Sequence, residues 1–283
     1  MAETGIKGAT EVKPGELNKK IRRIEITSRK LVEESFTGDY RSGFRGKGME
    51  FDSIRQYYPG DDVRNIDWNV SARQNKVFVK QFCEEREMNL FLLIDMSGSN
   101  NFGNKKDIIA ELGAMLAFTA CMNNDKVGAV LFTKKVEKFI PSKNGREHVL
   151  AIIENILEFE PESSETSISE ALKFFGLIEK KKSIVFIISD FLDQGYEKDL
   201  KIISKRHDLI LVRVIDRAEQ YIPHGAVFAF EDLETGEIVE LNSIGRELRL
   251  EEQEMKGRNV ITVYTDEDYI DPFRQFFRRR ARR

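Results

Sequence analysis

The sequence is poor in cysteine and histidine and has no long hydrophobic run. Its two cysteines, Cys83 and Cys121, do not form a metal-ligand spacing, and we expect both to be reduced thiols. The three histidines are widely separated, which disfavours a histidine metal site. The longest apolar runs, such as residues 183–189, are far shorter than the roughly 20 residues that cross a bilayer. No apolar segment typical of a secretory signal follows Met1, so we expect a cytoplasmic protein, with a peripheral place at the inner membrane as the alternative.

The chain also lacks a charge excess and several enzyme signatures. Its 45 basic and 48 acidic side chains leave a formal net charge of −3, so no overall field favours nucleic acid as a partner. There is neither a Gly-x-Ser-x-Gly elbow nor a His-Glu-x-x-His pair. Residues 43–48 contain three glycines and Lys47, but glycine follows the lysine where a phosphate-binding loop has serine or threonine. These absences disfavour several hydrolase and nucleotide-binding classes.

What the chain does have is an alternation of strand-like and helix-like segments. Hydrophobic residues make up 41% of it, including 20 phenylalanines, which is enough for a sizeable core. From residue 89 onward, short apolar runs alternate with longer segments of helical periodicity. Such alternation implies right-handed crossovers and a sheet covered by helices on both faces. The predicted fold is a doubly wound, mostly parallel α/β sheet of six strands, with residues 136–140 as an antiparallel strand.

We expect three regions along the chain. Residues 1–14 form a flexible tail, residues 15–86 an N-terminal appendage packed on the core, and residues 87–283 the α/β domain. The expected helices cover residues 16–34, 105–122, 146–159, 167–179, 196–205, 244–256 and 271–280. The expected strands cover residues 50–57, 76–84, 89–95, 126–133, 136–140, 183–190, 208–215, 226–231, 237–241 and 259–264.

Two of the apolar strands end in an acid. Asp95 closes the first and is followed by Ser97 and Ser99, whereas Asp190 closes the second. Ligands of open parallel sheets bind beyond the carboxyl ends of the strands, where these side chains converge if the two strands are neighbours. Carboxylate and hydroxyl oxygens suit a hard cation, Mg²⁺ or Mn²⁺, rather than zinc. The alternative is structural: the serines cap the next helix and Asp95 ends the strand, and spacing alone leaves the two interpretations equal.

The pattern resembles the von Willebrand factor A fold and its metal-ion-dependent adhesion site. That site also uses a threonine shortly before an Ala-Leu pair in a helix, which Thr166 and Ala171-Leu172 match. The resemblance implies that Ser97, Ser99 and Thr166 bind the metal directly and that Asp95 and Asp190 act through water. Such a metal keeps an open position for a carboxylate of a partner, which implies an adhesion site rather than an enzyme.

A longer block resembles the DUF58 family of A-domain-like proteins. It contains Arg55-Gln-Tyr-Tyr-Pro-Gly-Asp-Asp-Val-Arg64 and continues through Asp67-Trp68 to Arg73. Further matches bring the resemblance to roughly residues 40–241; they are Pro141–Gly145, Ser189–Asp193, Arg206–Asp208 and Glu234–Glu237. Many members carry two transmembrane helices before this region, and this chain resembles the soluble branch. The resemblance implies a partnership with a MoxR-type AAA+ ATPase, in chaperone-like assembly or metal insertion on a client that offers an acidic residue.

The charged block from Arg55 to Arg73 favours a structural interpretation. Its three arginines, three aspartates and the only tryptophan suggest a buried ion-pair network that fixes the N-terminal strands to the core, because a buried guanidinium must be paired. The alternative is a direct partner-binding surface.

Two other functions stay open. A metal-dependent phosphohydrolase could use the same crevice, although such enzymes favour more carboxylates on the metal and a general base. Arg278–Arg283, with five arginines in six residues, could bind anionic lipid or nucleic acid, or form a solvated helix end.

Overall fold

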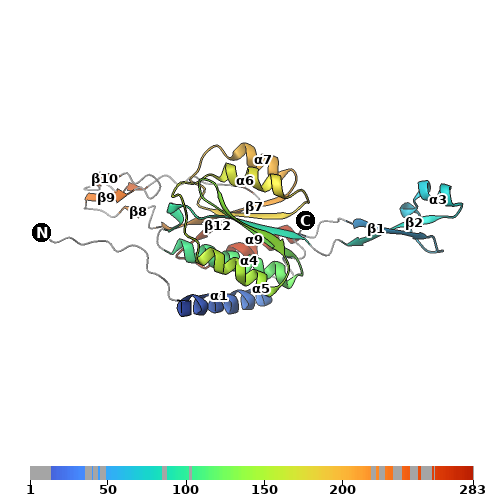
Figure 1. Cartoon of the computed structure of the whole chain (residues 1–283), viewed down its shortest axis with the longest axis horizontal. Helices are drawn as coiled ribbons and strands as arrows, with labels where there is room; N and C mark the ends of the chain where they lie inside the picture. Colours follow the sequence, from blue (N-terminus) through green and yellow to red (C-terminus); the bar gives the residue numbers. More distant parts are fainter. Residues whose placement is uncertain are drawn as a thin grey trace.

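The core of the protein is a six-stranded sheet with helices on both faces (Figure 1). The computed structural model describes residues 14–35, 40, 44, 49–84, 88–101, 104–217, 221–222, 227–231, 238–242, 248–249, 257 and 259–282. The strands lie in the order β12-β7-β6-β3-β4-β5, and all pairs are parallel except the edge pair β4–β5. The predicted doubly wound, mostly parallel sheet is therefore confirmed. Its members are β3 (Asn89–Asp95), β4 (Lys126–Phe132), β5 (Val136–Lys143), β6 (Ile184–Ser189), β7 (Asp208–Ile215) and β12 (Val260–Tyr264).

The central strands are apolar along almost their whole length because both of their faces are covered. Residues 90–94 of β3 and 184–188 of β6 are buried without exception, as expected for parallel strands under two helical layers. Gly128 of β4 has a steric role, since a Cβ atom there would lie 2.5 Å from the ring of Phe91 on β3. Burial on both faces thus leaves the strand ends as the places where polar side chains can gather.

Two helical layers enclose the sheet. One face is covered by α4 (Lys105–Met122), α5 (Arg146–Leu157) and α9 (Ile270–Ala281), and the other by α6 (Ile168–Ile178) and α7 (Glu197–Ser204). Helix α4 is buried on most sides, because α1 (Pro14–Ser35) lies along it opposite the sheet. Each face therefore has its own apolar core, and the two cores are separated by the sheet.

The N-terminal helix is held to the core by charge as well as by apolar contact. Arg146 of α5 donates to the buried Glu25 of α1 through two nitrogens, at 2.5 and 2.8 Å. Residues 36–48 carry no regular element in the prediction, but Tyr40 and Phe44 are helical and buried. The Tyr40 hydroxyl donates to Asp125 at 3.0 Å. The rings of Tyr40 and Phe44 both pack against Phe277 of α9.

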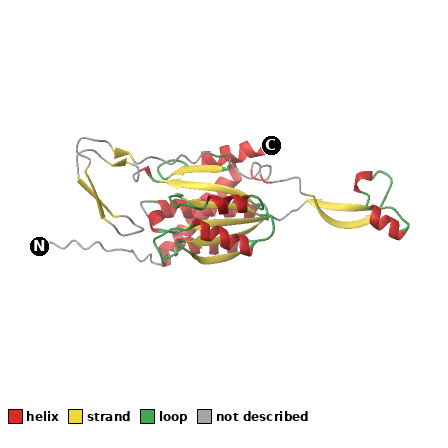
Figure 2. Ribbon diagram, turned by 90° about the horizontal axis from the view of Figure 1, so that it is seen from above, coloured by secondary structure: helices red, strands yellow, loops and turns green. Residues whose placement is uncertain are grey.

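The next segment forms a hairpin that projects from the core. Strands β1 (Met49–Gln56) and β2 (Phe78–Glu84) pair in antiparallel fashion, and between them lie η1 (Val63–Asn65) and α3 (Trp68–Gln74). Figures 1 and 2 show this hairpin extending beyond the end of the sheet, with α3 at its far end. The expected appendage thus has two parts: α1 lies on the helical layer, whereas the hairpin stands away from it.

The structural interpretation of the Arg55–Arg73 block is wrong. Its ion pair joins Arg55 to Asp61 within the hairpin, at 2.7 and 2.8 Å, and does not bind the hairpin to the core. Trp68 is 70% exposed rather than buried. The aromatic and charged composition of this block is typical of a core network, yet every partner that these residues find among the described residues is local.

The region between β7 and β12 departs from prediction in one place. Strands β9 (Val227–Glu231) and β10 (Ile238–Asn242) form the expected hairpin. Leu248 and Arg249, expected in a helix over residues 244–256, instead form strand β11, which pairs with β8 (Tyr221–Ile222). The other residues of that expected helix lie outside the described residues. Within the described part of the chain, no helix is long and apolar enough to span a membrane.

Candidate metal centre

The candidate site lies where the strand order reverses. Strand β3 pairs with β4 on one side and with β6 on the other, so the chain leaves β3 in one direction and later returns on its opposite edge. Asp95 is the last residue of β3, and Asp190 directly follows β6. Such a reversal opens a crevice at the carboxyl ends of the strands, which is the usual ligand site of doubly wound sheets. Strands β3 and β6 are therefore neighbours, which is the condition that the sequence pattern set for Asp95 and Asp190 to converge.

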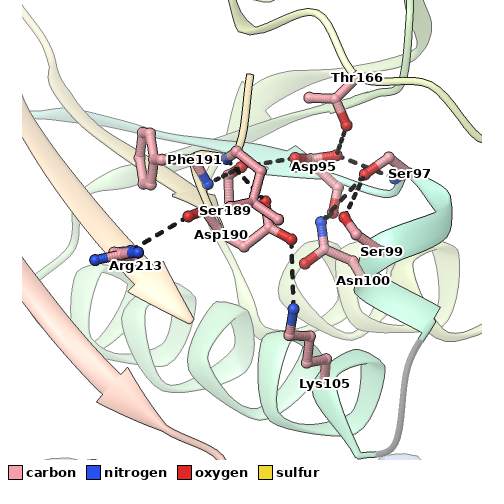
Figure 3. Close-up of polar contacts among 11 residues, drawn as sticks. Asp95, Ser97, Ser99, Asn100, Lys105, Thr166, Ser189, Asp190, Phe191 and Arg213 are labelled. Atoms are coloured by element: carbon pink, nitrogen blue, oxygen red, sulfur yellow. Dashed lines mark hydrogen bonds and ion pairs between the residues drawn. The ribbon is translucent and has the colours of Figure 1, made fainter. Parts of the chain in front are cut away.

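A short loop brings the two serines beside Asp95 (Figure 3). The backbone N–H of Ser97 donates to Asp95 Oδ1 at 3.0 Å, and the hydroxyl oxygens of Ser97 and Ser99 lie 3.3 Å apart. The Thr166 hydroxyl reaches the same Oδ1 atom from the loop before α6, at 3.4 Å. Gly98 N–H donates to the Ser164 carbonyl at 2.8 Å and ties the two loops together. Three hydroxyls from two loops therefore surround one buried carboxylate.

Ser189 is a member of this cluster that sequence reasoning missed. Its hydroxyl donates to Asp95 Oδ2 at 2.6 Å and accepts the backbone N–H of Phe191 at 3.0 Å. Phe191 has a φ of 61°, which is strained for a bulky residue and is a feature often found at functional sites. The signal in the sequence was a serine that ends the otherwise apolar strand β6 directly before Asp190.

Lys105 is the second residue that the sequence did not reveal. Its side chain is fully buried, and its ammonium group lies 3.3 Å from Asp190 Oδ2. The Asp190 carbonyl accepts Arg213 Nε at 3.3 Å, while Leu192 N–H donates to Asp190 Oδ1 at 3.2 Å. A cation in the first turn of a helix opposes the helix dipole, and this was the available signal that Lys105 has a special partner.

Asn100 provides a test of whether the cluster suits a cation. Its amide nitrogen donates to the Asp95 carbonyl at 3.1 Å and approaches Ser97 Oγ at 3.5 Å. Its amide oxygen is buried, yet it has no hydrogen-bond partner within the described residues. Buried polar atoms are normally satisfied, so an oxygen left with free lone pairs beside the cluster fits a positively charged ligand. Asn100 is thus a further residue of the cluster that the sequence pattern did not assign to the site.

The donor set is made of hard oxygens. Ser97, Ser99 and Thr166 offer hydroxyl oxygens, and Asp95 and Asp190 offer carboxylates. The described residues contain no group of three histidine, cysteine or acidic side chains placed to hold a metal. Hydroxyls with few carboxylates suit Mg²⁺ or Mn²⁺ better than zinc. The five residues expected from the sequence thus lie in one region and have the chemistry for a hard divalent cation.

The electrostatics of the cluster centre on Asp95. Burial, together with the nearby charge of Asp190, raises the pKa of Asp95 from 3.8 to about 6. Hydrogen bonds from Ser189 and Ser97 act in the opposite direction, because they stabilise the carboxylate. Near neutral pH the site therefore holds a buried negative charge whose cost the surrounding donors offset only in part.

This pKa predicts how the stability of the metal-free protein depends on pH. The folded state holds the Asp95 proton more tightly than the unfolded chain does. The contribution of Asp95 to the free energy of unfolding is therefore most favourable below about pH 4 and is lost as the pH rises to about 6. Above that range the ionised group costs about 3 kcal/mol. Asp95→Asn should therefore be more stable than wild type near neutral pH by up to about 3 kcal/mol, and the difference should shrink towards pH 4. Urea unfolding in EDTA across this range measures it, and a pH-independent difference would contradict the prediction.

The order and direction of the strands define a von Willebrand factor A-like α/β protein. The family model described as "Protein of unknown function DUF58" matches residues 53–259, and the chain therefore belongs to the DUF58 family. The chain is 28% identical over 229 residues to the uncharacterized protein Rv1480 of Mycobacterium tuberculosis. This match covers 78% of this chain and 72% of that protein. A stretch of 96 residues is 31% identical to the uncharacterized protein YeaD of Bacillus subtilis, covering 34% of this chain and 23% of YeaD.

Three solved structures are similar in fold. BatB from Bacteroides thetaiotaomicron has a TM-score of 0.44 and 17% identity, and the match covers 69% of this chain and 100% of that one. An aerotolerance-related membrane protein from Bacteroides fragilis has a TM-score of 0.45 and 16% identity, covering 69% and 98%. Proximal thread matrix protein 1 from the mussel byssus, with a zinc-occupied MIDAS motif, has a TM-score of 0.37 and 18% identity, covering 45% and 38%.

Proposed function

We propose that this protein is a non-enzymatic binding module in which a divalent cation, Mg²⁺ or Mn²⁺, grips a carboxylate of a partner protein. The observation that carries the proposal is the cluster of three hydroxyls around the buried Asp95 at the reversal of strand order. The unsatisfied amide oxygen of Asn100 supports the proposal, because it adds a neutral oxygen ligand for a cation beside the same hydroxyls. A second support is the position of the cluster at the ligand-binding edge of the sheet.

Each residue has a distinct task in this proposal. Ser97, Ser99 and Thr166 would hold the cation directly, and Asp95 and Asp190 would act through water, as the resemblance to adhesion sites implies. Asp95 orients the loop by accepting the Ser97 N–H, and Ser189 fixes the carboxylate from the other side. When bound, the cation supplies a Lewis-acidic position for an anionic ligand. Neutral hydroxyl donors leave its charge largely unneutralised, so a carboxylate from outside is attractive.

The proposed partner rests on the resemblance to DUF58 proteins rather than on the geometry of the site. Resemblance to DUF58 proteins implies a MoxR-type AAA+ ATPase, with this chain as the adaptor that presents a client carrying an exposed acidic residue. A hydrolytic role in the same crevice would call for a general base beside the cation. Among the side chains described around the cluster, which are hydroxyls, an amide, two carboxylates and a lysine bound to Asp190, only Asp95 and Asp190 could take that task, and the proposal uses both as water-mediated partners of the cation.

Affinity capture tests the proposal with the full chain as bait. Wild-type protein in Mg²⁺, wild-type protein in EDTA and Asp95→Ala in Mg²⁺ are incubated with lysate of the native host, and bound proteins are identified by mass spectrometry. The expected result is an AAA+ ATPase or a client retained only by wild type in Mg²⁺. The identified protein is then purified, and replacing its contacting acid by the amide should abolish binding.

Other outcomes would redirect the proposal. Equal retention in all three conditions would separate binding from the cation and overturn the adhesion mechanism. Phosphatase turnover with Mn²⁺ that disappears in Asp95→Ala would replace the adaptor by a hydrolase.

A further inference from the structure

The end of the projecting hairpin exposes apolar side chains that a monomer gains nothing by exposing. We define the hairpin tip as residues 57–77, the segment between β1 and β2 that includes η1 and α3. Tyr58, Val63 and Trp68 within it are 64, 63 and 70% exposed. The tip lies at the end of the molecule farthest from the sheet (Figure 1). Three large apolar side chains exposed within eleven residues of one projecting segment make the tip a candidate contact surface.

The tip is held in shape by its own carboxylates. Asp62 accepts the Arg64 N–H and caps η1, and Asp67 accepts two backbone N–H groups at the start of α3. Asp61 binds the Arg55 guanidinium through both oxygens and also accepts the Tyr58 N–H at 2.8 Å. All three acids of the tip are thereby engaged in fixing its backbone. The exposed side chains are consequently presented on a preorganised frame.

Arg55 and Lys80 neutralise Asp61 and Asp67, so the charges that remain on the tip are one acid, Asp62, and three cations. Arg64, Arg73 and Lys76 are exposed, and none of the three has an acidic partner among the residues that the structure describes. Lys80, on the adjoining strand, pairs with Asp67 at 3.6 Å. The tip therefore combines a tryptophan and a tyrosine with cations that point into solvent, which is the combination enriched where proteins meet the headgroups of a bilayer.

We infer that the hairpin tip inserts into the surface of an anionic lipid bilayer. A stable protein interface takes about 20–30 residues a side, and the exposed part of this short tip supplies fewer. A fluid headgroup layer needs no matching groove: it accepts the indole and phenol rings while anionic lipids attract the cations. The basic C-terminal end is less suited to this role, since Arg280 is engaged by Asp208 and stacks on Phe44.

The single tryptophan makes the inference directly testable. Trp68 is the only tryptophan of the chain, so its emission reports on the tip alone. The full chain is mixed, in EDTA, with vesicles of phosphatidylcholine alone or of equal parts phosphatidylcholine and phosphatidylglycerol. We expect a blue shift and co-sedimentation with the anionic vesicles only, both reversed by added salt. EDTA keeps the assay independent of the metal centre, so its result does not depend on the proposed function.

Variants separate the tip from other surfaces. Trp68→Ala should weaken co-sedimentation at least about tenfold, because the largest apolar anchor is lost. The matched control is Leu177→Ala, which removes a side chain 72% exposed on α6 and should have no effect. Changing Arg64, Arg73 and Lys76 together to glutamine should weaken binding about 100-fold, at roughly fivefold for each cation. Unchanged thermal midpoints would show that the variants fold.

Two results would overturn the inference. If wild type stays in the supernatant and its emission does not move, the occupant is not lipid, and an acidic protein surface becomes the one to test. If Trp68→Ala binds vesicles as well as wild type does, another surface carries the binding.

Discussion

Lys105→Met is expected to lower the free energy of unfolding by about 3–5 kcal/mol, the usual cost of removing one partner of a buried ion pair. The Lys105 side chain is completely buried, and the Asp190 carboxylate that it meets at 3.3 Å is almost so. Methionine fills nearly the same volume, so the loss comes from the charge left behind rather than from a cavity. Urea unfolding of the metal-free protein measures the change.

A neighbouring lysine gives the matched control. Lys106 lies one residue further along α4, and its ammonium donates to the Phe159 carbonyl at 3.0 Å instead of to a carboxylate. Lys106→Met should therefore cost about 1 kcal/mol. Adding Asp190→Asn to Lys105→Met should recover most of the stability, because no unpaired charge then remains. If both lysine variants lost the same free energy of unfolding, the Lys105–Asp190 ion pair would contribute no more to stability than the single hydrogen bond of Lys106.

Ser97→Ala with Ser99→Ala is expected to weaken Mn²⁺ binding by at least about 100-fold, since removing even an outer partner of a ligand costs 10–100-fold. The loop should keep its shape, because Asp95 holds it through the Ser97 backbone N–H and Gly98 is tied to Ser164. Mn²⁺ titration followed by electron paramagnetic resonance, or calorimetry, gives the affinity directly.

Two hydroxyls outside the cluster provide the comparison. Ser163 accepts the Glu165 N–H, and Ser204 donates to the Lys201 carbonyl. Changing both to alanine removes the same number of hydroxyl groups and should leave Mn²⁺ affinity unchanged. The metal assignment fails if both double variants bind as wild type does, or if wild type shows no saturable binding.

The fold could be predicted because its central strands obey a strong pattern. Strand β3 and helix α4 begin and end at the predicted residues, since a buried strand is apolar throughout and a helix covered on most sides is nearly so. The hairpin could not be placed in the same way. Tryptophan and tyrosine, as at Trp68 and Tyr58, are often largely buried. Residue type alone does not determine burial, however, because folded proteins also expose apolar side chains.

The site shows the same division between local and distant information. Asp95, Ser97 and Ser99 are adjacent in sequence, and Asp190 lies at an equivalent strand end, so pattern and topology sufficed to bring them together. Lys105 could not be assigned, because its partner depends on how α4 crosses the sheet. Asn100 was also missed, since an unsatisfied buried oxygen is a property of three-dimensional packing alone.

The path of the chain places the hairpin and the metal centre at opposite ends of one strand. Strand β2 leads into the start of β3 at Asn89, whereas Asp95 ends it on the far side of the sheet. The strand has seven residues, and its six steps separate these ends by about 20 Å. A chain anchored by one end would therefore direct its other end away from the anchoring surface. If the hairpin tip anchors the protein to a membrane, the metal centre is held near that membrane. Its effective concentration is then raised for a target bound to the same membrane, so two weak contacts together can give stable attachment.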